Sequence, residues 1–117
     1  MTSQAQHIAL AEHQGWHHCR PRSVEPHDLI GMKGPLRAWM PVPDYLNDLN
    51  AVREVEMTLS ELSPGKDAHG NPLPSDRARY RAQLCVVCIN EGGPIHATAA
   101  QRTKALVIAL GLWRDTL

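Results

Sequence analysis

The sequence predicts a single α+β domain, residues 1–117, in which helices cover one or both faces of a small antiparallel sheet. A length of 117 residues and a mass of 13.0 kDa suit one compact domain. The composition, 43% hydrophobic and 21% charged, is typical of a globular chain. The expected elements follow the order helix, two strands, helix, two strands, helix, which favours the layered α+β class.

The N-terminal part is expected to form a helix followed by a pair of strands. Residues 3–14 have the pattern of a short helix that ends at Gly15, a residue suited to a left-handed C-terminal cap. A strand pair with a long loop is expected over 16–40, with its strands at 16–20 and 36–40. Prolines and glycines predict that the connection between them is irregular. These residues are Pro21, Pro26, Gly31, Gly34 and Pro35.

The middle of the chain predicts a long helix and a surface loop. Pro43 and Asp44 form a helix-start signal, because Asp44 can cap free N–H groups. The helix is expected over 44–62, where apolar residues recur at three- and four-residue steps. These are Leu46, Leu49, Val52, Val55, Leu59 and Leu62. The polar, proline- and glycine-containing stretch 63–75 predicts an exposed loop that is open to proteolysis.

The C-terminal part is expected to form a hairpin over 79–97 and a helix over 99–111. Residues 79–89 alternate as in a strand but also fit a helical face, and we favour the strand because 85–89 is rich in β-branched residues and cysteine. Asn90-Glu91-Gly92-Gly93 would form the hairpin loop. Thr98 and Gln101 match a capping box. The last helix is apolar around most of its circumference, for which an oligomer contact is one explanation.

Charge and cysteine content narrow the class of protein. Twelve Lys and Arg balance twelve Asp and Glu, with a pI near 7.1, so no global field attracts nucleic acid or a membrane, and neither is an expected partner. Three cysteines are too few and too odd in number for a secreted disulfide framework, which favours the cytoplasm. The sequence has neither a secretory signal pattern at its first residues nor an apolar run of membrane-spanning length.

Several short motifs, taken together, resemble one known family. They are Gly15-Trp16, the run 43–51 (PDYLNDLNA), the run 97–102 (ATAAQR), Ala105, and the closing Leu110-Gly111-Leu112-Trp113. In this set the chain resembles the small phage and prophage proteins of the phage ABA sandwich domain family. The resemblance implies a three-layer α/β/α sandwich and a phage or prophage origin. It implies no activity, because the family has none assigned.

A polar set within the matching runs is the candidate ligand site. Its members have more hydrogen-bonding capacity than a helix start requires. They are Tyr45, Asp48, Asn50, His96 and Arg102. The alternative is that these side chains cap helices and bond between layers.

Cysteine and histidine side chains are the usual ligands of zinc, and this chain has enough of them for one site. The candidate donors are Cys85, Cys88, Cys19, His17 and His18. On a strand, Cys85 and Cys88 would point to opposite faces, so we expect them to be small buried hydrophobic residues and expect no metal or cofactor. Cys19 beside His17 or His18 lacks a third group that would orient a nucleophile, and the common catalytic motifs are missing. The protein is therefore expected not to be an enzyme.

Arg77, Arg79 and Arg81 form a basic cluster that would project from one face of a strand. It could contact nucleic acid or a nucleotide phosphate. A charged edge strand that resists aggregation explains the same residues, and we favour that explanation.

These observations favour a phage-encoded accessory protein of the host cytoplasm that acts by binding. One role is inhibition of a host protein, which predicts an exposed apolar patch at Trp16 or Trp39. The alternative is a homo-oligomeric pocket protein that sequesters a small nucleotide signal of host anti-phage defence, which predicts a concave polar site shared between chains. A small zinc-binding module is the lesser alternative.

Overall fold

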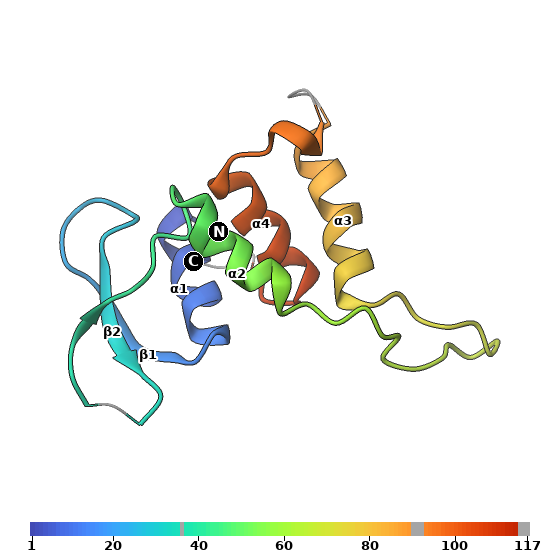
Figure 1. The fold of residues 1–117 in the computed structure, drawn as a ribbon, viewed down its shortest axis with the longest axis horizontal. Coiled ribbons are helices and arrows are strands. Elements are labelled where there is room, and N and C mark those ends of the chain that lie inside the picture. The colour runs from blue at the N-terminus through green and yellow to red at the C-terminus, as the bar shows by residue number, and fades with distance from the viewer. Residues whose placement is uncertain (36, 90–92, 115–117) are drawn as a thin grey trace.

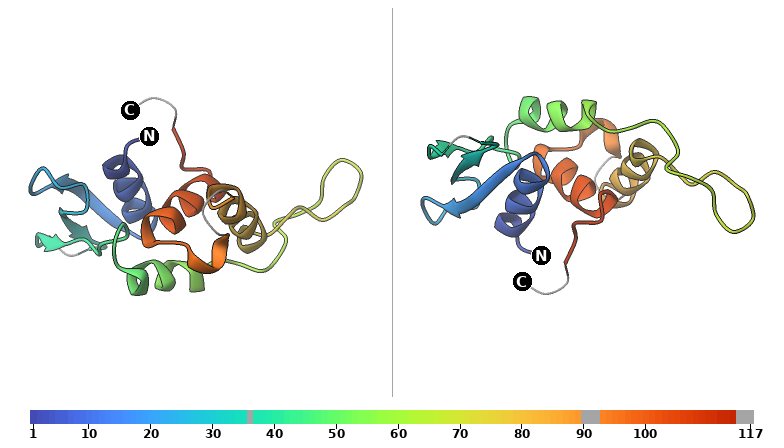
Figure 2. Two further views of the ribbon diagram at one scale, coloured as in Figure 1. Left: turned by 90° about the horizontal axis from the view of Figure 1, so that it is seen from above. Right: turned by 90° about the horizontal axis from the view of Figure 1, so that it is seen from below.

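The computed structural model describes residues 1–35, 37–89 and 93–114. These residues form four α-helices, one 3₁₀ turn and a three-stranded antiparallel sheet (Figure 1). The predicted α+β class is therefore confirmed. The sheet lies at one end of the molecule, and the helices extend from it in the order α1, α4, α3, with α2 alongside α4 (Figures 1 and 2). The three-layer form of the fold stays a prediction.

The sheet has the order β1-β2-β3, with β1 at Trp16–Pro21, β2 at Leu29–Lys33 and β3 at Met40–Pro41. The expected long irregular loop after β1 is wrong, because β2 lies within it. The expected strand at 36–40 is also wrong, because of its described residues Met40 alone belongs to a strand, β3. The chain turns back early, since the Arg22 N–H donates to the Asp28 carbonyl at 2.9 Å and the two side chains form an ion pair. A strand can therefore start at Leu29, whose side chain is buried.

A bulge in β1 decides which side chains face outward. Trp16 and His17 pair with Lys33 and Met32, but the register shifts before Arg20, which pairs with Ile30. His18 within the bulge has a φ of 55°, the left-handed region that few residues other than glycine adopt. Because directly opposed residues share a face, the outer face carries His17, Arg20, Ile30, Met32 and Pro41.

Helix α1, at Ser3–His13, matches the expected range and packs against β1 and α4. Thr2 caps it by accepting a hydrogen bond from the Ala5 N–H, and Gly15, with a φ of +94°, turns the chain into β1. His7 is fully buried, and its ring nitrogens lie 3.1 and 2.7 Å from the carbonyl oxygens of Pro26 and Pro43. This side chain therefore connects α1 to the β1–β2 loop and to the approach to α2.

Helix α2 spans Leu49–Met57 and is shorter than the expected 44–62. Asp44 does accept hydrogen bonds from backbone N–H groups, those of Leu46 and Asn47 at 3.1 Å, but these close a turn that is not continued as a helix. The N-cap is Asp48, which accepts from the Asn50 N–H at 2.9 Å. The expected loop at 63–75 is confirmed up to residue 74. After the buried Leu59, every side chain from 60 to 74 is exposed.

Residues 76–87 form helix α3, Asp76–Val87, so the expected hairpin over 79–97 is wrong. Ser75 caps the helix by accepting from the Ala78 N–H, and Tyr80, Leu84 and Cys88 are buried at four-residue steps. A strand would have placed all three on one face together with residues 82 and 86, which are exposed. Of the expected hairpin loop at 90–93, residues 90–92 lie outside the described residues, and Gly93 precedes the 3₁₀ turn η1, Pro94–His96.

Helix α4, Ala99–Ala109, is the centre of the helical part and contacts α1, α2 and α3. The capping box of Thr98 and Gln101 is present as predicted, with both of its hydrogen bonds formed. Because α4 contacts three other helices, these contacts explain why it is apolar around most of its circumference. No contact with a second copy of the chain is needed to explain it. In the described part of the protein, no helix combines the length and apolar character needed to cross a membrane.

Candidate functional site

A cavity of about 270 Å³ lies between α2, α3 and α4. Its lining is unusual in holding three arginines and one carboxylate, so the wall carries an excess of positive charge. The lining residues are Glu56, Leu59, Arg77, Tyr80, Arg81, Leu84 and Arg102. We refer to this cavity as the arginine pocket.

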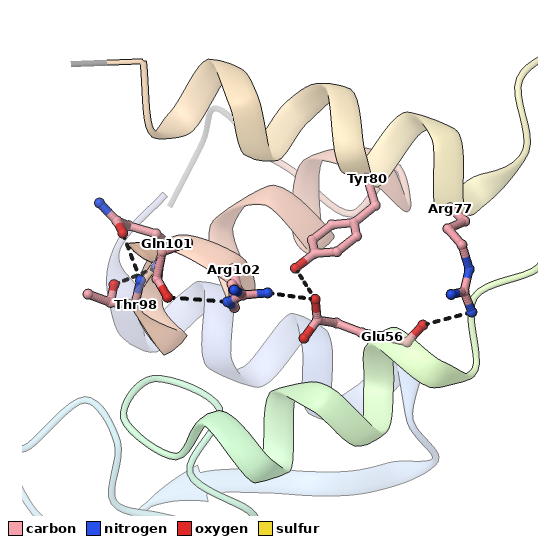
Figure 3. Close-up of polar contacts among 7 residues, drawn as sticks. Glu56, Arg77, Tyr80, Thr98, Gln101 and Arg102 are labelled. Carbon is pink, nitrogen blue, oxygen red and sulfur yellow. Dashed lines mark hydrogen bonds and ion pairs between the residues drawn. The ribbon is translucent and has the colours of Figure 1, made fainter. Parts of the chain in front are cut away.

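The inner wall of the arginine pocket is a triad of Glu56, Tyr80 and Arg102, one residue from each helix (Figure 3). Glu56 Oε2 accepts a hydrogen bond from the Tyr80 hydroxyl at 2.6 Å and from Arg102 Nη1 at 3.0 Å. Arg102 Nε also donates to the Ala97 carbonyl at 3.2 Å. The Glu56 and Arg102 side chains are 21% and 22% exposed, so this ion pair is more shielded from water than a surface pair.

Tyr80 and Arg102 keep their protons at ordinary pH. Burial raises the pKa of Tyr80 well above its usual value, and the hydrogen bond to Glu56 raises it further. Burial lowers the pKa of Arg102, but the Glu56 carboxylate and Tyr80 more than offset this, so its pKa is raised. Tyr80 is therefore a neutral hydrogen-bond donor and Arg102 a permanent cation, and Tyr80 is not suited to act as a general base near neutral pH.

Arg77 forms a second wall of the pocket, at the start of α3. Its Nη2 donates to the Leu59 carbonyl at 3.2 Å and lies 3.5 Å from the Glu56 carbonyl (Figure 3). Its Nε is buried and has no hydrogen-bond acceptor among the described residues, although Glu61 Oε1 lies 3.5 Å away as an ion pair. This N–H is enclosed by protein beside the Glu61 carboxylate, so Arg77 adds positive charge to the pocket wall but does not offer its Nε to a ligand.

Arg81 lies one helical turn after Arg77 and is exposed. It forms no ion pair within the described parts of the chain. Arg79, between them, points elsewhere and pairs with Asp76. The expectation that Arg77, Arg79 and Arg81 project from one face is therefore wrong, because they lie on a helix, where residues two apart do not share a face.

The five residues of the predicted ligand set do not come together, and of these Arg102 alone lines the arginine pocket. Tyr45 is buried, its ring meets His7 edge-on at 5.7 Å, and its carbonyl accepts a hydrogen bond from Thr103. Burial, with the charges of Glu54 and Cys19, raises the pKa of Tyr45 to about 12. Asp48 caps α2, Asn50 lies exposed in its first turn, and His96 is exposed in η1.

Sequence reasoning missed Glu56 and Tyr80 as members of the site. The available signal was the helical face through Tyr80 and Leu84, which was weighed and set aside in favour of a strand. On a helix, Arg77, Tyr80, Arg81 and Leu84 follow three- and four-residue steps and form one stripe. That stripe faces the pocket.

The candidate zinc donors are separated. Cys88 is buried beneath α3 as expected, but Cys85 is exposed, so the expectation that both are buried is wrong. Cys19 lies in β1, where burial and then the charge of Glu12 raise the pKa of its thiol. The ring of His17 contacts His18 and the Gly34 carbonyl, each at 2.7 Å. Over the described ranges, no three His, Cys, Asp or Glu side chains are grouped as a metal site would require, and we drop the zinc alternative.

Comparison with known proteins gives no relative: no protein-family model, curated protein or solved structure matches this chain. The resemblance to the phage ABA sandwich family therefore stays a prediction.

Proposed function

We propose that the protein acts by binding, without catalysis, and that the arginine pocket takes a small ligand bearing a phosphate or another compact anion. The observation that carries this proposal is the charge of the pocket wall, where Arg77, Arg81 and Arg102 surround a single carboxylate, Glu56. Guanidinium groups bind phosphates through two parallel hydrogen bonds. Glu56 pairs with Arg102 and Glu61 pairs with Arg77, which leaves Arg81, an arginine with no ion pair to the described residues, to receive the anion.

The volume of the pocket limits the size of the ligand. About 270 Å³ is at the lower end of ligand-sized cavities. A phosphate with part of a nucleoside fits this volume, and a larger nucleotide would extend past Arg81 into solvent. Of the roles suggested by the phage resemblance, sequestration of a small nucleotide signal of host defence fits a concave, basic site in the host cytoplasm. The pocket is formed within one chain, so the proposal does not require an oligomer.

Isothermal titration calorimetry with inorganic phosphate, a nucleoside monophosphate and a dinucleotide tests this proposal. We expect at least one of these anions to bind, and Arg81→Gln to weaken binding by about tenfold, the loss of one charge-assisted contact. Arg79→Gln is the matched control, because Arg79 lies on the same helix outside the pocket and should leave the affinity unchanged. Absence of binding by all three anions, or equal losses in the two variants, would contradict the proposal.

Inhibition of a host protein is the second candidate, and a different observation favours it. Three exposed apolar side chains lie near the end of α3 and in η1, namely Val86, Ile89 and Ile95. Of the two tryptophans at which an exposed apolar patch was expected, Trp16 is buried and Trp39 is exposed. Pull-down from a bacterial lysate with the wild type and with a Val86→Ser, Ile95→Ser variant tests this candidate, which requires a partner captured by the wild type alone.

A further inference from the structure

The outer face of the β1-β2-β3 sheet combines an exposed aromatic ring with unpaired positive charge. Trp39 is 44% exposed, and the Arg20 guanidinium carbon lies 4.1 Å from the centroid of its ring. Arg20 reaches it from β1 across β2, because the bulge at His18 turns Arg20 to the outer face. This face is turned away from α1, and Arg20, Trp39 and Pro41 are exposed on it.

Charge is strongly segregated in the N-terminal half of the chain. Residues 1–62 contain five Lys and Arg, and four of them lie in the sheet segment 16–41, which also holds three histidines. The same residues contain eight Asp and Glu, and six of these lie outside the sheet segment. Arg22 is paired with Asp28. Neither Arg20, which lies against the Trp39 ring, nor Arg37, which is exposed two residues before Trp39 in the chain, forms an ion pair with any residue that the structure describes.

We propose that this sheet face binds single-stranded nucleic acid, with a base stacked on the Trp39 ring and with Arg20 and Arg37 against the phosphates. Proteins that bind single strands combine aromatic side chains, on which bases stack, with positive charge along the backbone path. An apolar protein surface would leave Arg20 and Arg37 desolvated and unpaired, which is costly. The balanced total charge had argued against nucleic acid as a partner, but total charge does not reveal how charge is distributed over the fold.

Fluorescence anisotropy with labelled single strands of about 12 nucleotides, one of DNA and one of RNA, tests the proposal on the full chain. We expect binding that weakens several-fold between about 50 and 200 mM salt. Trp39→Ala should lower the affinity at least about fivefold, and Trp39→Phe should retain most of it, since both rings stack. Arg20→Gln should reduce the slope of log affinity against log salt by about 0.7, the value of one phosphate contact on a single strand.

Arg53→Gln is the matched control, because Arg53 is an exposed arginine on α2, outside the sheet segment. Thermal unfolding of each variant verifies that it is folded, and Trp39→Phe keeps the test valid if Trp39→Ala does not fold. No binding of either strand at the lower salt concentration would overturn the proposal. A second outcome would also overturn it: polyglutamate displaces the labelled strands as effectively as unlabelled nucleic acid does, and the Trp39→Ala variant binds the strands normally. That outcome would indicate an acidic protein partner.

Discussion

The Tyr80 hydroxyl on α3 donates a 2.6 Å hydrogen bond to Glu56 Oε2 on α2, and the same oxygen accepts from Arg102 on α4. One carboxylate oxygen therefore connects three helices. Tyr80 and Arg102 lie 24 and 46 positions after Glu56 in the sequence. In surroundings that are largely shielded from water, such bonds are stronger than they would be on the surface. The triad fixes the inner wall of the arginine pocket.

Tyr80→Phe removes one donor of this triad and is expected to lower the free energy of unfolding by about 1 to 2 kcal/mol, the range for a hydrogen bond to a charged group that keeps another partner. Urea unfolding measures the change. Tyr45→Phe is the control, because Tyr45 is equally buried but its hydroxyl has no hydrogen bond within the described residues. Similar losses in the two variants would contradict a role for the Tyr80 hydroxyl.

The two tyrosines of the chain are expected to resist ionisation until the protein unfolds. Burial raises the pKa of Tyr45 to about 12 and that of Tyr80 further. Because the folded state holds both phenolic protons more tightly than the unfolded state, this stabilisation is complete below the ordinary pKa of about 10 and is lost as the pH rises through 12. Phenolate absorbance and circular dichroism should therefore change together in an alkaline titration. Ionisation of one tyrosine near pH 10, with the fold intact, would show that the side chain is accessible.

Gly31→Ala is expected to destabilise the protein by about 1 to 3 kcal/mol, as other insertions of a methyl group into filled space do. A Cβ at this position would lie 3.2 Å from Cys19 Sγ and from the His17 carbonyl, and 3.4 Å from a methyl of Val42. Cys19→Ala removes the first of these contacts. Urea unfolding measures the free energy of unfolding of the two single variants and of the double variant. The loss in the double variant should be smaller than the sum of the losses in the two single variants. Strict additivity would show that Cys19 does not limit the space.

Trypsin is expected to cut first after Lys66, in the exposed loop that extends away from the body (Figure 1). The two fragments should stay together, because α4 packs on α1 and α2 from the other side of the cut. Denaturing electrophoresis identifies the cut, and size-exclusion chromatography without denaturant tests whether the fragments remain associated. Lys66→Gln is the control and should delay the first cut. Fragments that separate on the column would show that the helical contacts do not hold the two parts together once the loop is cut.

Local signals predicted the elements whose ends are fixed by nearby residues. The capping box of Thr98 and Gln101 placed α4 correctly, and α1 ends before Gly15 as expected. Residues 79–89 could not be assigned in this way, because their apolar positions satisfy both a period of two and the helical period. What distinguishes the helix is that residues 82 and 86 are exposed while Tyr80 and Leu84 are buried, a property of the assembled fold.

The candidate site could be predicted only in part. Arg102 was identified from its hydrogen-bonding capacity, but its partners lie on elements far away in the sequence, and one of them was assigned to a strand. Tyr45 and Asp48 were identified by the same criterion and have structural roles, as a buried ring and a helix cap. Hydrogen-bonding capacity alone does not distinguish a cap from a ligand contact, because both need an exposed or half-buried polar atom.

The position of α4 has a consequence for how the protein is made. This helix contacts α1, α2 and α3, yet it follows all three along the chain and is synthesised after them. A nascent chain that has not reached residue 99 presents the apolar faces of the other helices with nothing to cover them, a state prone to aggregation. We therefore expect α1, α2 and α3 to reach their final packing only once α4 has been synthesised, and fragments that lack α4 to require chaperones to stay in solution.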